Sequence, residues 1–181
     1  MRDEAQIRSD LTAIAAAEKA MATNPDWQIT TKQGADHLAI ACPLAIDGVI
    51  VSGLRLEVFG PQAVPASRSF YGLSAHLFAV QHLRNWHLCR IEFDPENPLK
   101  PHRNPLGSHG APPIVRGPHI HPFLENAALG VDALTPEGNL PIAFPIKNEL
   151  ATFDDILDII RTGFNVPGLW LEEPTWSRML V

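Results

Sequence analysis

Two histidines, His119 and His121, stand one residue apart between Pro118 and Pro122. In an extended chain, side chains two positions apart project to the same side, so both imidazoles can reach one point. The two prolines restrict the backbone on either side of the pair. Near neutral pH an imidazole can act as an acid, a base, a hydrogen-bond donor to phosphate or a metal ligand. We therefore take His119 and His121 as candidate catalytic residues that divide acid and base work.

The stretch before this pair adds four candidates for binding a ligand, namely His102, Arg103, His109 and Arg116. Arg103 and Arg116 can hold an anion through charge-assisted hydrogen bonds. An isolated His-x-His pair is more often structural, with rings that bond to backbone carbonyls. The gathering of histidine and arginine in one stretch instead favours a site.

Residues 58–124 carry most of the histidine and little of the acid. Seven of the eight histidines fall in this segment, which holds six Lys or Arg and three acids and so has a charge of +3. The rest of the chain holds eight cations and seventeen acids, a charge of −9, and the two parts give the net charge of −6. Such segregation creates a local positive potential that attracts anions, while the overall acidity disfavours long polyanions. We expect a phosphate-bearing small molecule or nucleotide as ligand, and no binding of long duplex nucleic acid.

A metal ion is an alternative partner for the same side chains. His102, His109, His119 and His121 could together supply three imidazole ligands. Their spacing matches no signature such as HExxH, and Glu125 is the only acid close behind them. The sequence therefore predicts no metal site and leaves any cofactor open.

The apolar periodicity predicts the elements that must position these residues. From Asp3 to about Ala22 the chain is alanine-rich, with apolar residues at helical spacing, which predicts an amphipathic helix. Asp47-Gly48 lies between two apolar runs and predicts a two-residue hairpin turn. The strands that it joins are expected near Leu38–Ile46 and Val49–Phe59.

Two further strands are expected, at Phe70–Val80 and at about residues 85–94. In the second, apolar and charged residues alternate, so one side should face the core and the other water. On this pattern Arg90 and Glu92 are solvated partners with no role in a site. We expect this strand to be the last of a meander.

The chain changes character after Asp94. Seven prolines between residues 95 and 118 prevent continuous helix or central strand, which predicts a long loop. Order returns near the C-terminal end, where Thr152 as N-cap, Asp155 three residues later and Gly163 as C-cap delimit an amphipathic helix.

The expected fold class is α+β, with an antiparallel meander of about four strands, N- and C-terminal helices and a long Pro-rich loop. The 181 residues are 45% hydrophobic and 19% charged, which suits a single domain over residues 1–181. Cys42 and Cys89 lack CxxC spacing and are expected to be buried, reduced thiols. The chain shows neither the apolar core of a signal peptide nor a membrane-spanning run, so we expect a cytoplasmic, bacterial-type protein with no membrane partner.

The order of helix, meander, Pro-rich segment and C-terminal helix resembles that of the ubiquitin-conjugating and RWD folds. The stretch "PHIHP" is similar to the His-Pro region of the conjugating enzymes. No cysteine follows His121, so a conjugating activity would lack its nucleophile. The resemblance implies at most a non-catalytic protein-binding relative. The two H-Φ-[S/T]-Φ motifs of the two-histidine phosphoesterases are absent, because "HIHP" and "HLFA" lack the hydroxyl residue. We assign no family.

Two functions follow as expectations. The first is a small protein with a His/Arg-lined anion site that binds a phosphate-containing ligand, either a nucleotide or a nucleic-acid-like molecule. The sequence leaves open whether this ligand is also cleaved, as a His-dependent phosphodiester or phosphate-ester hydrolase would do. The alternative is a non-catalytic protein-interaction module of RWD-like shape, whose Pro-rich loop contacts a protein partner.

Overall fold

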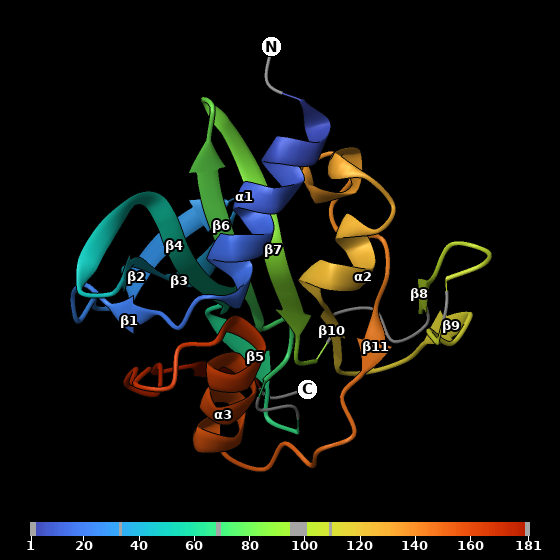
Figure 1. Ribbon diagram of the computed structural model, residues 1–181. Coiled ribbons are helices and arrows are strands. Elements are labelled where there is room, and N and C mark those ends of the chain that lie inside the picture. Colours follow the sequence, from blue (N-terminus) through green and yellow to red (C-terminus); the bar gives the residue numbers. More distant parts are fainter. Residues whose placement is uncertain (1–2, 33, 68–69, 95–100, 109, 180–181) are drawn as a thin grey trace.

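The computed structural model describes residues 3–32, 34–67, 70–94, 101–108 and 110–179, and Figure 1 shows the arrangement of its elements. The described part mixes helices with antiparallel sheet, so the expected α+β class is confirmed. None of the helices in these ranges is long and apolar enough to cross a membrane.

The N-terminal helix α1 covers Glu4–Ala16 and is shorter than expected. Asp3 caps its first turn by accepting a hydrogen bond from the amide of Ala5. The backbone turns extended at the C-cap residue Ala17, and the ammonium group of Lys19 donates hydrogen bonds to the carbonyls of Ala15 and Ala17. Lys19 is only 2% exposed. Beyond it, β1 (Ala20–Met21) pairs with β3 (Ala35–Ile46) instead of continuing the helix.

Eight of the described strands form one sheet in the order β1-β3-β4-β6-β7-β10-β11, in which β10 covers His119–His121 and β11 covers Phe144–Pro145. The eighth strand, β2, pairs with β3 on the same edge as β1, away from β4. The longer strands are β2 (Gln28–Lys32), β3 (Ala35–Ile46), β4 (Val49–Pro61), β6 (Ser74–Gln81) and β7 (Arg84–Glu92). All of their pairings are antiparallel.

The hairpin between β3 and β4 is confirmed. Ile46 pairs with Val49, and the two residues between them have φ of 52° for Asp47 and 76° for Gly48. Two consecutive positive φ values define the type I′ turn, which matches the twist of the joined strands.

The expected sheet of about four strands is too small. β7 was expected to be the last strand, but β10 (His119–His121) pairs with it, and β11 (Phe144–Pro145) pairs with β10. β10 has only three residues and lies between Pro118 and Pro122, so the local pattern gives no sign of a strand. Its existence depends on the partner strands.

Within the proline-rich stretch, β8 (His102–Arg103) pairs with β9 (Ile114–Val115), so this part of the chain folds back on itself. Residues 95–100 and 109 lie outside the described residues. A separate parallel pair joins β5 (Ala63–Pro65) to β12 (Ser177–Met179).

Three short helical elements complete the chain: α2 (Phe123–Ala127), the 3-10 helix η1 (Val131–Leu134) and α3 (Phe153–Phe164). The capping box of Thr152 and Asp155 is confirmed at the start of α3. The expected C-cap at Gly163 is wrong, because the helix continues to Phe164 and Asn165 caps it in the left-handed conformation.

Gly163 has a packing role instead. A Cβ atom built on it would lie 3.0 Å from a methyl of Ile120 and 3.2 Å from a methyl of Ile91. The glycine therefore lets α3 approach β7 and β10 closely.

The sheet has two different faces. The core face carries buried apolar residues in register across the strands, among them Leu56, Leu77, Cys89 and Ile91. Leu11 of α1 and Ile160 of α3 belong to the same buried cluster. Figure 1 shows α1 in front of strands β6 and β7, and α3 near the lower end of the sheet. Cys42 and Cys89 are buried and unpaired, as expected.

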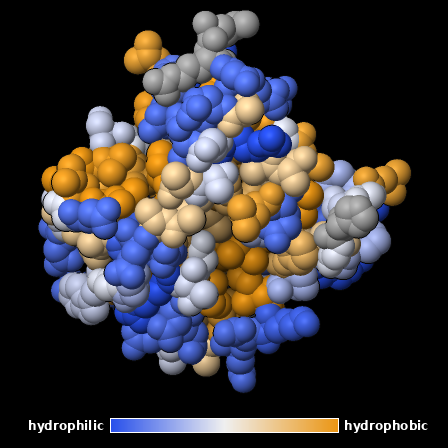
Figure 2. Space-filling view, viewed as in Figure 1, coloured by the Kyte–Doolittle hydropathy of each residue, from blue (hydrophilic) through white to orange (hydrophobic). Residues whose placement is uncertain are grey.

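We call the opposite side of strands β4, β6, β7 and β10 the histidine face. It carries Arg55, Glu57, Phe59, His76, Phe78, His87, Arg90, Glu92, His119 and His121, which follow from the strand register. On β4 the two faces are distinct, since Leu54, Leu56 and Val58 are buried while Arg55 and Glu57 are more exposed. Between α3 and β11, Figure 2 shows a separate apolar hollow, which includes Ile120, Pro145 and Ile159.

Candidate functional site

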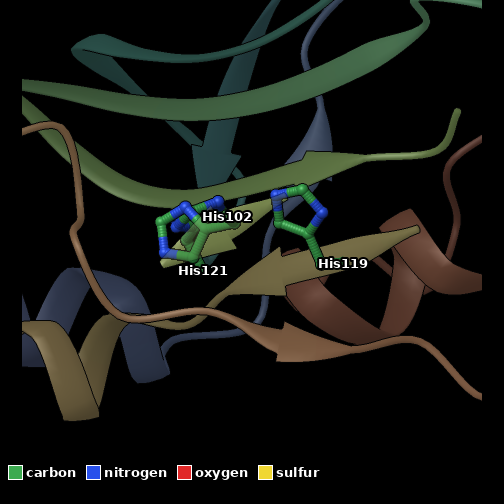
Figure 3. A group of neighbouring side chains, drawn as sticks. All are labelled: His102, His119 and His121. Carbon is green, nitrogen blue, oxygen red and sulfur yellow. The ribbon is translucent and has the colours of Figure 1, made fainter. Parts of the chain in front are cut away.

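Three histidines from two strands converge at one end of the histidine face (Figure 3). The ring centroids of His102 and His121 are 4.7 Å apart, those of His119 and His121 are 5.0 Å apart, and those of His102 and His119 are 5.5 Å apart. One nitrogen from each ring lies within 4.8 Å of the other two. We call this group the three-histidine cluster.

The pairing of β10 with β7 places two of these rings. His119 lies opposite Glu92 and His121 lies opposite Arg90, while Ile120 between them lies opposite Ile91 on the core side. His119 is 4% exposed and His121 is fully buried. The two rings therefore occupy the same side of β10, and His102 reaches them from β8.

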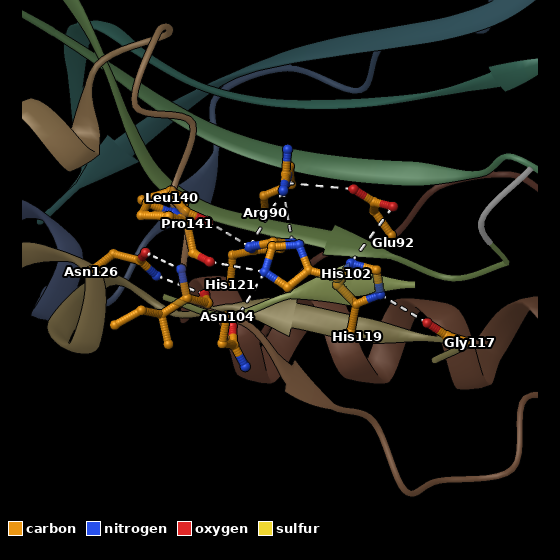
Figure 4. Close-up of polar contacts among 11 residues, drawn as sticks. Arg90, Glu92, His102, Asn104, Gly117, His119, His121, Asn126, Leu140 and Pro141 are labelled. Atoms are coloured by element: carbon orange, nitrogen blue, oxygen red, sulfur yellow. Dashed lines mark hydrogen bonds and ion pairs between the residues drawn. The ribbon is translucent and has the colours of Figure 1, made fainter. Parts of the chain in front are cut away.

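Each ring of the three-histidine cluster makes a hydrogen bond to a backbone carbonyl (Figure 4). The bonds are 2.8 Å from His119 Nδ1 to Gly117 O, 2.6 Å from His121 Nδ1 to Leu140 O and 2.8 Å from His102 Nε2 to Pro141 O. A carbonyl oxygen only accepts, so the nitrogen that faces it carries the hydrogen. In the neutral ring the other nitrogen then carries a lone pair and no hydrogen, namely Nε2 of His119, Nε2 of His121 and Nδ1 of His102. Nη2 of Arg90 lies 2.8 Å from Nε2 of His121.

Two asparagines fix the segment that supplies two of these carbonyls. Asn126 is fully buried and bonds to both the amide and the carbonyl of Ile142, at 2.7 and 2.9 Å. Asn104 does the same for Ala143, at 2.6 and 2.8 Å. These bonds replace a strand ladder and hold Leu140 and Pro141 against the rings.

Arg90 and Glu92 belong to the same site, although the sequence suggested a solvated pair. The Nε atom of Arg90 lies 3.6 Å from Oε1 of Glu92, and Oε2 of Glu92 lies 3.6 Å from Nε2 of His119. The side chain of Arg90 is only 11% exposed. Alternation predicted the correct face of β7, but it could not show that β10, β8 and residues 140–143 border that face.

Burial decides the protonation of these groups. Burial, and then the guanidinium of Arg90, lowers the pKa of His121 well below its usual range. Burial also lowers the pKa of His119, against an opposing effect of its hydrogen bond to Gly117. Both rings are therefore neutral at neutral pH, whereas Arg90 stays charged even though burial lowers its pKa.

A pocket of about 350 Å³ opens beside Arg90 on the histidine face. Its lining comes from three strands and the loop before β6, and consists of Phe59, Gly72, Leu73, Ser74, His76, Arg90 and Glu92. The ring of His76 lies 4.9 Å from that of Phe59 and 5.5 Å from that of Phe78. The pocket thus combines aromatic surface with one positive and one negative side chain.

Two of the other predicted binding residues, Arg103 and Arg116, are among those that the structure describes. Arg103 and Arg116 are exposed, and within the described ranges no hydrogen bond or ion pair joins either to the three-histidine cluster. Arg103 follows His102 on β8 and so projects to the opposite side. His109 lies outside the described residues.

Comparison with known proteins gives no match: no model of a protein family fits this chain, and no curated protein or solved structure is significantly similar to it. The functional assignment therefore depends on the geometry of the site.

Proposed function

We propose that this protein binds a phosphate-containing small molecule, with its phosphate at Arg90 and the rest of the ligand in the adjoining pocket. The environment of Arg90 carries this proposal. The Nε atom is buried and has no hydrogen-bond partner among the described residues. Its nearest carboxylate is 3.6 Å away, beyond hydrogen-bond distance.

A buried guanidinium whose ion pair is as loose as 3.6 Å, and whose Nε–H makes no hydrogen bond to a described residue, is only partly compensated for the water that it has lost. A phosphate oxygen would supply both the missing negative charge and the missing acceptor. A guanidinium offers several N–H donors in one plane and is well matched to phosphate. Arg90 thus takes the role that the sequence suggested for Arg103 and Arg116.

The pocket suggests the class of ligand. Its volume of about 350 Å³ is in the range of small-molecule sites. Phe59 and His76 offer ring surface against which a flat group can stack. Glu92 can accept a hydrogen bond from a hydroxyl or amino group, and its charge disfavours a bare polyanion. These features together favour a nucleotide-like ligand over inorganic phosphate.

Binding of nucleoside monophosphates, measured by calorimetry in a buffer with a metal chelator, tests this function. Arg90→Gln should weaken binding by roughly tenfold or more, because it removes a charge-assisted hydrogen bond. Arg84→Gln is the matched control, since Arg84 lies on the same strand but at its exposed opposite end. The control should bind as the parent does.

The proposal fails if the folded parent binds none of these nucleotides. It also fails if Arg90→Gln retains a native circular dichroism spectrum and parental affinity. Arg90→Lys separates charge from geometry: it keeps the cation, loses the planar donor arrangement and should give intermediate affinity.

A further inference from the structure

We infer that the three-histidine cluster is a binding site for a divalent transition-metal ion of the zinc type. The ligand atoms are Nδ1 of His102 and Nε2 of both His119 and His121. This inference does not depend on the phosphate proposal.

The hydrogen bonds of the rings support this inference first. A histidine that binds a metal through one nitrogen usually donates the other N–H to a carbonyl or carboxylate, which fixes the ring and its tautomer. All three rings of the cluster donate to backbone carbonyls in this way. The second nitrogen of each ring therefore carries a lone pair that can bind a metal ion without prior loss of a proton.

The distances are compatible with this. A tetrahedral ion with Zn–N bonds of about 2.1 Å needs nitrogens about 3.4 Å apart. One nitrogen of each ring lies within 4.8 Å of the other two, so three imidazole ligands of one ion must approach by roughly 1 Å or slightly more. His102 can supply this movement, because it is only partly buried and belongs to the two-residue strand β8.

Arg90 does not block the site. Its Nη2 atom lies 2.8 Å from Nε2 and 3.3 Å from Nδ1 of His121. If Nη2 lay in the ring plane and pointed at the lone pair of Nε2, the ring would lie between it and Nδ1, and its distance to Nδ1 would be much longer than 3.3 Å. Nη2 therefore lies over the face of the ring, and the lone pair of Nε2, which lies in the ring plane, stays available.

A second pair of histidines on the same face gives an internal comparison. His76 and His87 have ring centroids 5.9 Å apart and are also largely buried, but their Nδ1 atoms have no described hydrogen-bond partner. Among the described residues, the three-histidine cluster is the one group of at least three histidines, cysteines or acids with ligand atoms this close. Clustering of histidine alone does not produce this arrangement.

The ligand set indicates the kind of ion. Imidazole suits Zn²⁺, Cu²⁺, Ni²⁺ or Fe²⁺, whereas Mg²⁺ and Ca²⁺ need oxygen ligands. Three protein ligands leave a coordination position for water or for a ligand oxygen, as in catalytic zinc sites. The carboxylate of Glu92 lies 3.6 Å from Nε2 of His119, one of the proposed ligand atoms.

The test is a titration of the full chain, freed of metal by a chelator, with Co²⁺ and then Zn²⁺ in phosphate-free buffer. We expect one equivalent of Co²⁺ to bind with the visible absorption of four- or five-coordinate cobalt, and Zn²⁺ to displace it. His102→Ala and His119→Gln should each lower the affinity by roughly tenfold or more. His37→Gln, on the distant strand β3, is the control and should leave the affinity unchanged.

Thermal melting without metal shows whether each variant is folded. His102→Ala is the safer variant, because its ring is partly exposed whereas that of His119 is buried. A folded parent that binds no ion, or binding that persists in both variants, would overturn the inference. Nucleotide binding is measured with a chelator and metal binding without phosphate, so the two proposals can fail separately.

Discussion

His76 and His87 lie next to each other on the histidine face and are largely buried, with ring centroids 5.9 Å apart. Burial, followed by the charge of Arg90, lowers the pKa of His76 to about 3 and that of His87 to about 4. In the unfolded chain a histidine titrates near pH 6.5. The folded protein therefore excludes protons that the unfolded chain takes up.

We predict a loss of stability in mild acid. Between about pH 6.5 and pH 4 the unfolded state binds more protons, so the free energy of unfolding falls as the pH falls. His76→Phe should reduce this dependence by roughly 1–3 kcal/mol at pH 4.5 relative to pH 7, because phenylalanine does not titrate and fits between Phe59 and Phe78. Urea denaturation at the two pH values measures it.

His37→Gln serves as the control for this prediction, since β4 separates its strand, β3, from β6, which carries His76. Equal pH dependence in the parent and in His76→Phe would contradict the assignment of the acid sensitivity to His76.

Individual residues also show where sequence reasoning stops. The histidines of the cluster could be proposed from their spacing, because side chains two apart on an extended chain share a side. Arg90 could not be proposed in this way, because a charged residue that alternates with apolar neighbours is usually exposed to solvent, and the sequence of β7 looks the same in both cases. The roles of Asn104 and Asn126 could not be predicted either. Asn104 is hydrogen-bonded to the backbone of a residue 39 positions later and Asn126 to one 16 positions later, and no local sequence pattern indicates such bonds.

At the level of elements, the sequence predicted the features that depend on only a few neighbouring residues. The Asp47-Gly48 turn and the Thr152 capping box each act within a few residues and were predicted correctly. β10 depends instead on hydrogen bonds to β7, which lies well before it in the sequence. The C-cap of α3 was placed at Gly163 because glycine is common there, whereas the glycine serves the contact with β10.

That contact leads to a prediction about α3. Gly163→Leu places a side chain against Ile91 and Ile120 and should destabilise the protein by about 1–3 kcal/mol through overpacking. Leucine is the better helix former, so a loss reports on packing and not on propensity. Because Ile120 lies between His119 and His121, metal and nucleotide affinities should fall as well.

Thr162→Leu is the matched control, since it adds the same side chain at the neighbouring, exposed position of α3. Chemical denaturation and the cobalt titration measure both variants. If Gly163→Leu were as stable as Thr162→Leu, the close approach of the helix to β10 would not matter for stability.

Across the whole molecule, Asn165 joins parts of the chain that are 149 residues apart. Its side-chain amide donates to the carbonyl of Ala16 at the end of α1, and its own carbonyl accepts from the amide of Lys19. Its backbone is left-handed, with a φ of 53°. Asn165 thus caps the C-terminus of α3 and also forms hydrogen bonds to the chain at the end of α1.

Two substitutions separate these roles. Asn165→Gly keeps the left-handed conformation and loses only the side-chain bond, so it should cost about 1 kcal/mol. Asn165→Ala loses the bond and also strains the backbone, and should cost about 1 kcal/mol more. Thermal denaturation followed by circular dichroism measures both; equal stability of the two variants would show that the left-handed cap is not under strain.

The bonds that orient the three rings have a consequence for the order in which the protein can fold. Contacts among β3, β4, β6 and β7 are local hairpins that can form as the chain leaves the ribosome. The carbonyl that orients His121 comes from Leu140, 19 residues later. Until β10 is synthesised, β7 is an edge strand with unpaired backbone groups, which can pair with the same strand of another nascent chain.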